Sequence, residues 1–212
     1  MAARLRVGAI VLAAGSGSRL GAQPKALLEL EGEPLICRLL AALSGAGVDE
    51  VVIVLGHHAE AIEAVVRGFP VTLARNPAPD DGQLSSVRIG LQVLSAKLDA
   101  VIVALADQPL INAQDISALI RAFADRDDAA MVVPRVEGLP GNPVVIEARL
   151  RDQWLAGDVN AAGRQWRDDH PGRVHWFDSD NHRYRVDIDT PEDLRRFTER
   201  TGQTLRWPRA LA

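Results

Sequence analysis

The sequence has little cysteine, no surplus of basic residues and no long apolar run. Its single cysteine, Cys37, excludes a disulfide framework and a cysteine metal cluster, and its five histidines lack zinc-site spacing. No apolar stretch approaches the roughly 20 residues that a membrane-spanning helix needs, and the N-terminus has no signal-peptide core. Lys and Arg number 24 against 28 Asp and Glu, which argues against a general nucleic-acid binder. We therefore expect a cytoplasmic protein that binds neither membranes nor nucleic acid.

The 212 residues, 47% of them hydrophobic, predict a single domain, 1–212, with a sizeable core. Apolar runs alternate with amphipathic stretches of helical spacing. Strands are predicted at 7–13, 50–55, 70–74, 100–105 and 129–134, and helices at 34–46, 59–67, 83–98 and 115–123. This rhythm predicts an α/β fold in which helices cover both faces of a mostly parallel sheet.

The pattern changes after Pro134. Gly138–Gly141 indicates a turn, and the strand expected after it, at 142–146, pairs antiparallel with a neighbour. Further helices are predicted at 147–155 and 161–169, and further strands at 174–177 and 184–186. Thr190 and Asp193 form the capping signature of a last helix.

A glycine-rich loop, Leu12-Ala-Ala-Gly-Ser-Gly-Ser-Arg-Leu-Gly-Ala-Gln-Pro-Lys25, follows the first predicted strand. Glycines at the carboxyl end of a parallel strand let backbone amides approach an anion. The spacing of Gly15, Gly17 and Gly21 does not match the dinucleotide fingerprint, and Lys25 does not stand where a Walker loop places its lysine. The loop is thus a phosphate-binding candidate of another kind.

Two cations, Arg19 and Lys25, accompany the glycines of this loop. Arg19 offers a planar fork for phosphate oxygens, and Lys25 offers a mobile point charge. Both would stabilise a triphosphate as it is attacked and pyrophosphate leaves, which makes them catalytic candidates. The alternative is a mobile glycine turn with solvated charges.

Carboxylates follow two later extended segments. Asp107 follows the strand predicted at 100–105. Its carboxylate supplies hard oxygen ligands, which suit Mg²⁺ or, alternatively, Mn²⁺. Asp187 and Asp189 are two residues apart in an extended segment, so they point the same way, and they would complete the site if the fold brings this segment to Asp107. The alternatives are that Asp107 caps the turn at Pro109 and that Asp189 belongs to a turn, leaving Asp187 as the ligand.

These motifs resemble the signatures of the nucleotidyltransferases with a Rossmann-like fold, over nearly the whole chain. The resemblance is greatest to the molybdopterin cytidylyltransferases and the related guanylyltransferases. It implies a three-layer sandwich like that of the nucleotide-diphospho-sugar transferases, with a nucleotide-binding part at about 6–110 and an antiparallel, acceptor-binding part at about 130–186. The expected nucleotide-binding residues are Leu12, Ala13, Ala14, Gly15, Gly17, Arg19, Lys25, Gly82 and Ser86.

The resemblance also implies an acceptor side. The segment Asn76-Pro…Gly82…Ser85-Ser86 resembles one that lies beside the nucleotide and substrate in the family, although one serine alone would suit a helix cap. Gly141-Asn142-Pro143 resembles the family's Gly-His-Pro substrate segment, with Asn142 in place of histidine. The segment Gly157-Asp158…Gly163-Arg164 resembles a third family segment loosely. Ser85, Ser86, Gly141, Asn142 and Pro143 are therefore the expected acceptor-binding residues.

The resemblance implies transfer of CMP from CTP to the terminal phosphate of the molybdopterin cofactor, with release of pyrophosphate. Ala14 favours CTP, because the cytidylyltransferases usually carry Ala-Ala-Gly where the guanylyltransferases carry Ala-Gly-Gly. A molybdoenzyme or its chaperone is the expected partner, and the protein itself is expected as a monomer or weak homodimer.

Three alternatives stay open. The segment Ser86–Leu91 resembles the methylerythritol-phosphate cytidylyltransferases, although Leu105-Ala-Asp-Gln-Pro109 departs from their usual Asp-Ala-Ala-Arg-Pro. Sugar-1-phosphate uridylyltransferases share the pattern of glycine, arginine and lysine. A non-catalytic nucleotide-binding homologue is the third alternative.

Overall fold

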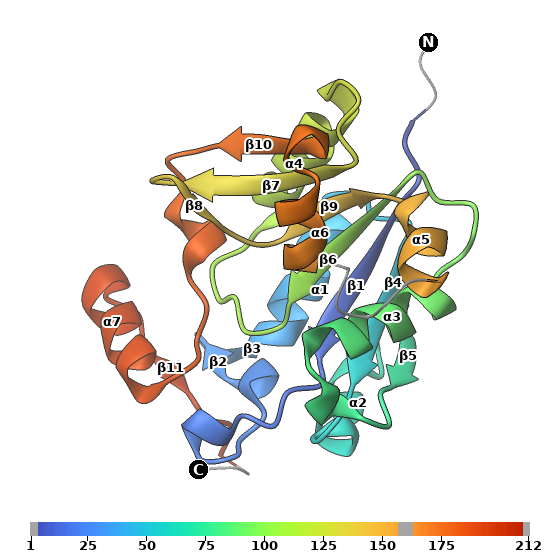
Figure 1. Ribbon diagram of the computed structural model, residues 1–212. Helices are drawn as coiled ribbons and strands as arrows, with labels where there is room; N and C mark the ends of the chain where they lie inside the picture. The colour runs from blue at the N-terminus through green and yellow to red at the C-terminus, as the bar shows by residue number, and fades with distance from the viewer. Residues whose placement is uncertain (1–3, 157–162, 210–212) are drawn as a thin grey trace.

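The structure is a computed structural model that describes residues 4–156 and 163–209. A central sheet of eight strands crosses the molecule (Figure 1). Its strands are β1 (Val7–Ala13), β4 (Glu50–Leu55), β5 (Thr72–Arg75), β6 (Ala100–Leu105), β7 (Met131–Val136), β8 (Leu139–Pro140), β9 (Val144–Glu147) and β10 (Val174–Asp178). The strand order is β10-β7-β9-β6-β1-β4-β5, with β8 paired to β7.

The pairing confirms a mostly parallel sheet with an antiparallel portion. β1 pairs in parallel with both β4 and β6, and β4 with β5. β9 runs antiparallel to both of its neighbours, β6 and β7, while β10 is again parallel to β7. The chain moves outward from β1 through β4 to β5 and then returns to the other side of β1 as β6. The loops after β1 and β6 therefore diverge, which creates the crevice where α/β sheets bind ligands.

Helices form a layer on each face of this sheet, which confirms the three-layer sandwich. The helices are α1 (Leu35–Gly45), α2 (Ala59–Val66), α3 (Gln83–Val93), α4 (Ala113–Asp125), α5 (Leu150–Ala156), α6 (Gly163–Asp169) and α7 (Pro191–Thr201). One core cluster joins α1, α2 and α4 to Ala9 and Val11 of β1, and the other joins α3, α5 and α6 to Ile10 and Leu12. Side chains alternate between the two faces of a strand, so the continuously apolar β1 supplies both cores.

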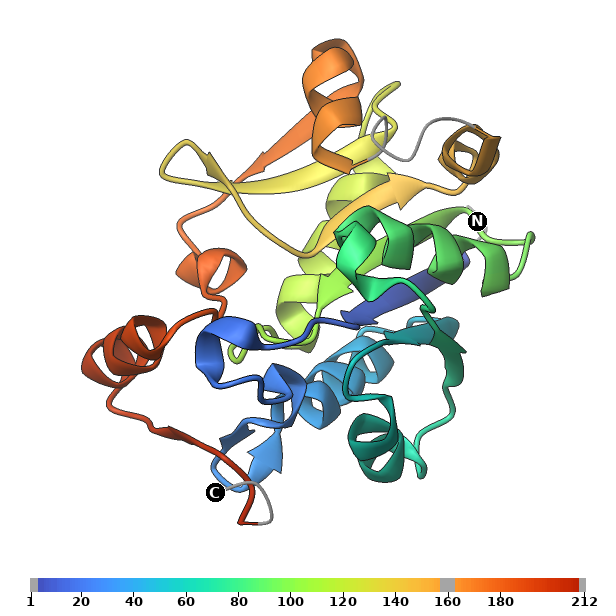
Figure 2. The same ribbon diagram turned by 60° about the horizontal axis from the view of Figure 1, so that its bottom comes forward.

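A small second sheet carries the end of the chain to the glycine-rich loop. Its strands, β2 (Glu29–Leu30), β3 (Glu33–Pro34) and β11 (Leu205–Arg206), are antiparallel and were not expected from the sequence. A third cluster packs Leu20 of the loop with Leu30, Ile188 and Phe197. In Figures 1 and 2, α7 and β11 accordingly lie outside the central sheet, beside the segment that follows β1. The capping box of Thr190 and Asp193 at the start of α7 is confirmed.

Two expectations about secondary structure are wrong. The predicted strand at 184–186 is part of a 3₁₀ helix, η6 (His182–Arg185), which starts where the Asn181 side chain accepts a hydrogen bond from the Arg183 N–H. The predicted helix at 83–98 ends as α3 at Val93, because the backbone of Leu94 is extended. The N–H of Ser95 then donates to the Glu50 carboxylate at 3.1 Å, in place of the backbone hydrogen bond that a further helical turn would make.

Among the described residues, no helix combines the length and the apolar composition needed to cross a bilayer.

Candidate functional site

The glycine-rich loop turns sharply after β1. Gly17 adopts φ 62°, and its carbonyl accepts hydrogen bonds from the N–H groups of Leu20 and Ala22 at 2.8 and 3.0 Å. A Cβ at Gly17 would lie 1.9 Å from the carbonyl oxygen of Gln23, so a side chain at this position requires the loop to move. Gly21 is also left-handed, but a Cβ there would meet no described atom within 4 Å. Gly17 is thus the glycine on which the loop's shape depends most.

The turn after β4 supports the start of this loop from the neighbouring strand. A Cβ at Gly56 would lie 2.4 Å from the carbonyl oxygen of Ala14. The His58 ring contacts the carbonyl oxygen of Ser16 through Nε2 at 3.0 Å. Sequence reasoning assigned no role to Gly56 or His58. Their position directly after a strand parallel to β1 was the signal available, because such turns meet at one sheet edge.

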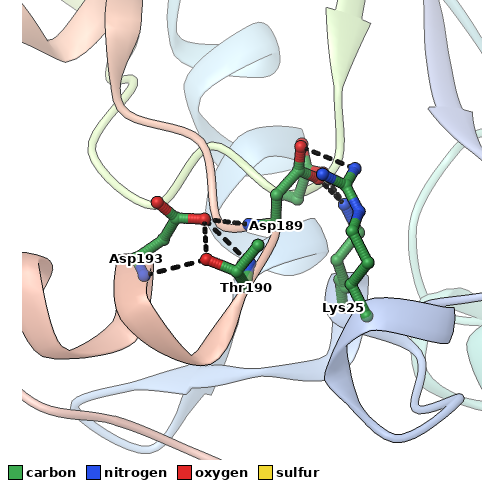
Figure 3. A network of polar contacts seen from close by, with 6 residues as sticks. Lys25, Asp189, Thr190 and Asp193 are labelled. Carbon is green, nitrogen blue, oxygen red and sulfur yellow. Dashed lines mark hydrogen bonds and ion pairs between the residues drawn. The ribbon is translucent and has the colours of Figure 1, made fainter.

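An ion-pair network brings together four of the predicted residues. Lys25 Nζ lies 2.5 Å from Asp107 Oδ2 and 2.6 Å from Asp189 Oδ1. The Arg19 guanidinium lies 2.9 Å from Asp189 Oδ2. Lys25 therefore pairs with two of the three predicted metal ligands, and Arg19 with one. Figure 3 shows the carboxylate of Asp189 directed to Lys25 on one side, with Thr190 and Asp193 on the other.

Burial and charge shift the pKa values of this network. Burial alone would lower the pKa of Lys25, but the carboxylates of Asp107 and Asp189 outweigh it and raise that pKa above its usual value. Burial would raise the pKa of Asp189, but Lys25 and Arg19 bring it below the usual range. The pKa of Asp187 is raised by burial and by the negative charges of Asp107 and Asp189. Asp187 therefore faces the other two carboxylates without sharing their cations.

These groups line a cavity of about 340 Å³ between the loops that follow β1 and β6. Its predicted members are Leu12, Ala14, Gly15, Arg19, Gly82, Ser86, Asp107, Asp187 and Asp189. Ala13 and Lys25 line a smaller adjoining space. We call the two spaces together the donor cavity. It gathers residues from the glycine-rich loop, the start of α3 and the segment before α7.

The loop before α3 is organised by a residue that sequence reasoning quoted without assigning it a role. The buried amide of Asn76 donates to the hydroxyls of Ser85 and Ser86 at 2.7 and 2.9 Å. The Ser85 hydroxyl in turn donates to the Gly82 carbonyl oxygen at 2.7 Å, so it serves the loop itself. Gly82 adopts φ 92° and ψ 175°, a conformation that is essentially restricted to glycine. Ser86 lines the donor cavity, and Ser85 is held inside the loop.

A second cavity of about 420 Å³, the acceptor cavity, shares Gln83 and Leu105 with the donor cavity. Gly141 and Asn142 line it as expected, while Pro143 follows them in a cis peptide bond. Its other walls are mostly apolar, with one tryptophan and two arginines, and comprise Leu84, Val87, Val103, Met131, Val133, Pro140, Val144, Trp154, Gly163, Arg164, Gln165 and Arg167. The predicted segment at 157–162 lies outside the described residues.

Gln108 connects the two sides of the site and was also quoted without a role. It is buried, and its amide donates to the carbonyl oxygens of Asn142 at 3.2 Å and Tyr184 at 3.3 Å. The Asn142 N–H donates to the same Tyr184 oxygen at 2.8 Å. The N–H of Ile188 donates to the carbonyl oxygen of Asp107 at 3.1 Å. The end of β6, the turn before β9 and the segment carrying Asp187 are thus joined by hydrogen bonds.

The carboxylates suit a metal ion that is shared with a ligand. Among the described residues, no three acidic, histidine or cysteine side chains are arranged as a metal-binding group. Mg²⁺, however, usually takes one or two carboxylates together with water and substrate phosphates. Asp107 Oδ1 is buried without a hydrogen-bond partner among the described residues, and Asp187 lines the same cavity. These two residues fit Mg²⁺ in the presence of a triphosphate.

Comparisons with known proteins show the family to which the chain is similar. Residues 9–174 match the family described as "MobA-like NTP transferase domain". Nicotine blue oxidoreductase from Paenarthrobacter nicotinovorans is 32% identical over 88% of this chain and 94% of its own length. The CMP-5'-(3-aminopropyl)phosphonate synthase of Streptomyces rubellomurinus is 40% identical over 97 residues, which are 42% of this chain and 15% of that protein.

The fold is likewise shared with solved structures. A nucleotidyl transferase from Methanothermobacter superposes with a TM-score of 0.75 at 26% identity, over 92% of this chain and 97% of that one.

Proposed function

The chain belongs to the family of MobA-like NTP transferase domains and is a nucleotidyltransferase, and we propose that it transfers CMP from CTP to the terminal phosphate of molybdopterin. The observation that carries the reaction type is the donor cavity. Arg19 and Lys25 stand there against Asp107 and Asp189, at the sheet position where α/β proteins bind ligands. Cations for phosphates and free carboxylate oxygens for a metal are what nucleotidyl transfer requires.

The proposed reaction is an in-line displacement at the α-phosphorus. An anionic oxygen of the acceptor phosphate attacks this phosphorus, the bond to the oxygen bridging to the β-phosphate breaks, and pyrophosphate leaves with the electron pair. Arg19 and Lys25 hold the β- and γ-phosphates and stabilise the charge that develops on the leaving group. Asp107 and Asp187 would hold Mg²⁺, which neutralises phosphate charge when it is bound. No general base is required, because the attacking oxygen is already ionised.

CTP is the proposed donor for two reasons. Ala14 lines the donor cavity, and the cytidylyltransferases that this chain resembles usually carry alanine at this position of the loop. The partial relative from Streptomyces rubellomurinus is named for a CMP-containing product.

The walls of the acceptor cavity favour molybdopterin over a polyol or sugar phosphate. Val103, Met131 and Trp154 present apolar surface, while Arg164 and Arg167 add positive charge. A polyol needs several hydrogen-bonding partners, since each unpaired hydroxyl loses binding energy. A ring system that carries a phosphate suits apolar walls and arginines better. A cytidylyl- or uridylyltransferase acting on methylerythritol phosphate or a sugar-1-phosphate is therefore the alternative.

A second candidate function follows from the relative from Paenarthrobacter, which is an oxidoreductase by name and matches nearly full length. Reduction of nicotine blue by NADH or NADPH is the reaction to test. The donor cavity favours transfer, because hydride transfer has no need of paired phosphate cations beside free carboxylates.

The test is pyrophosphate release with Mg²⁺ and each of CTP, GTP and UTP, with molybdopterin, methylerythritol phosphate, a sugar-1-phosphate or no acceptor. Release that needs both CTP and molybdopterin is expected. Turnover of a polyol or sugar phosphate would overturn the acceptor. Tight CTP binding without any release would indicate a non-catalytic homologue, and NADH oxidation with nicotine blue would indicate the second candidate.

A further inference from the structure

We propose that Asp189 is a positioning residue that competes with the triphosphate: its carboxylate pairs with Arg19 and Lys25 and yields both cations to the nucleotide. The sequence pattern had suggested Asp189 as a third metal ligand. Both of its carboxylate oxygens are instead occupied by cations, Oδ1 by Lys25 at 2.6 Å and Oδ2 by Arg19 at 2.9 Å. This inference rests on the donor cavity binding a nucleotide.

The backbone holds Asp189 where it can do this. Its N–H donates to Asp193 Oδ2 at 3.1 Å, and the same oxygen accepts from the Thr190 N–H at 2.8 Å (Figure 3). Asp193 belongs to the capping box of α7, so the position of Asp189 is set by the start of a helix. Arg19, by contrast, has a side chain 64% exposed and lies on a short 3₁₀ turn. An anion fixed by the helix start therefore orients an exposed cation.

Asp187 differs from Asp189 although it is two residues away. Among the described residues Asp187 has no ion pair, whereas Asp189 pairs with both Arg19 and Lys25. Asp107 keeps Oδ1 without a partner while Oδ2 contacts Lys25. The carboxylate oxygens available for a metal thus belong to Asp107 and Asp187, whereas both oxygens of Asp189 pair with the side chains of Arg19 and Lys25.

Charge balance gives the exchange a direction. Three carboxylates face two cations in the donor cavity, which leaves one net negative charge before a ligand enters. A triphosphate must displace Asp189 from Arg19 and Lys25 together, so a linear polyphosphate competes better than a single phosphate. The bound triphosphate then places its own negative charge beside Asp107 and Asp187. The nucleotide should therefore strengthen metal binding, and the metal should strengthen nucleotide binding to the same degree.

The test uses inorganic tripolyphosphate and CTP as ligands and compares Asp189→Asn with Asp187→Asn. Each variant removes one carboxylate charge from the same cavity, but Asp189→Asn also removes the partner of Arg19 and one of the two carboxylate partners of Lys25. Without metal, calorimetry should show tripolyphosphate binding about tenfold tighter in Asp189→Asn and less than about threefold tighter in Asp187→Asn. Mn²⁺ affinity in the presence of CTP should fall about tenfold or more in Asp187→Asn and change less than about threefold in Asp189→Asn.

Two results would overturn the inference. Equal metal-free affinities of Asp189→Asn and wild type for tripolyphosphate would show that Asp189 does not compete with the phosphates. A loss of Mn²⁺ affinity in Asp189→Asn as large as that in Asp187→Asn would show that Asp189 is a metal ligand. If Asp189→Asn melts well below wild type, Arg19→Met supplies the alternative measurement. Arg19 loses its one carboxylate partner among the described residues when Asp189 moves, so Arg19→Met in the Asp189→Asn background must lose more tripolyphosphate affinity than Arg19→Met in the wild type, where Asp189 competes for the cation; equal losses would overturn the inference.

Tripolyphosphate separates this inference from the proposed function, because it carries neither base nor acceptor. Wild-type protein that binds tripolyphosphate as described but transfers no nucleotide from CTP would contradict the proposed function alone. If the wild type transfers CMP but Asp189→Asn and wild type bind tripolyphosphate equally without metal, the inference alone is contradicted.

Discussion

The donor and acceptor cavities share a wall but are built in opposite ways. In the donor cavity, ion pairs join residues that are far apart in the sequence, such as Lys25 with Asp107 and Asp189. The acceptor cavity is lined mainly by apolar side chains from β6, β7, β9 and α5, with Arg164 and Arg167 added. Charge stabilisation determines chemistry, whereas shape and apolar contact determine which molecule fits. The difference teaches that reaction type and acceptor choice are carried by separate residues.

The largest expected effect concerns the donor cavity alone. Asp107→Ala should lower kcat by about a thousandfold or more, because it removes a carboxylate at the phosphates and leaves Lys25 with one partner fewer. CTP turnover with excess Mg²⁺, together with a thermal melt, measures this.

The exposed Asp127→Ala, a change of the same type, should keep kcat within about twofold of wild type. An active, folded Asp107→Ala would refute the role of Asp107.

Gly17→Ala tests whether the donor cavity depends on the shape of its loop. A Cβ would come within 1.9 Å of the Gln23 carbonyl oxygen, so the loop must shift, and CTP affinity should fall about a hundredfold. Gly21→Ala is the matched control, since its φ is also positive at 72° but its Cβ would meet no described atom within 4 Å. It should cost about 1 kcal/mol of stability and little affinity. Equal losses in both variants would show that the contact with Gln23 is unimportant.

Gln108→Met sharpens the boundary between the two cavities. The change keeps the volume but removes the hydrogen bonds to the carbonyl oxygens of Asn142 and Tyr184; the Tyr184 oxygen keeps the bond from the Asn142 N–H, whereas that of Asn142 loses its Gln108 donor. The KM for the acceptor should rise about tenfold, because a displacement at the turn before β9 weakens contacts with the acceptor. The Kd for CTP, measured by calorimetry, should stay within about twofold.

Gln92→Met, on the exposed face of α3, should change neither constant. A Gln108→Met variant with equal losses for CTP and acceptor would show a general structural role.

The smallest expected effect concerns the packing behind the site. Burial raises the pKa of Tyr184 to about 12, so the folded protein keeps this proton at pH values where an unfolded chain loses it. The resulting stability is fully present below pH ~10 and is lost as pH rises through about 12. Tyr184→Phe also loses the hydrogen bond to the Asp115 carbonyl oxygen at 3.0 Å, which costs about 1 kcal/mol at neutral pH.

Urea unfolding of wild type and Tyr184→Phe from neutral pH to pH ~12 measures this effect. The difference between their free energies of unfolding should shrink as pH rises. A constant difference would contradict the assignment.

The elements built by continuous apolar runs could be predicted from the sequence. The strands at 7–13, 50–55 and 100–105 were predicted with the bounds that the structure has, because a buried parallel strand is apolar throughout. The glycine-rich loop and Asp107 also lie where the parallel sheet places the ends of β1 and β6. Local pattern and sheet topology were sufficient for these.

Features that depend on distant contacts could not be predicted. Tyr184–Val186 has the composition of a strand, but the Tyr184 hydroxyl donates to the Asp115 carbonyl oxygen on α4, and no local pattern contains that contact. The pairing of β11 with β2 joins residues near opposite ends of the chain. The role of Gln108 depends in the same way on carbonyl oxygens from two other segments.

The most direct test of the central claim is the mass of the product formed from CTP and molybdopterin in the presence of Mg²⁺. We predict a product in which CMP is joined to the molybdopterin phosphate through a new pyrophosphate linkage, with one pyrophosphate released for each molecule formed. A GMP or UMP adduct formed preferentially from mixed nucleotides, or no adduct while molybdopterin and CTP stay intact, would contradict it.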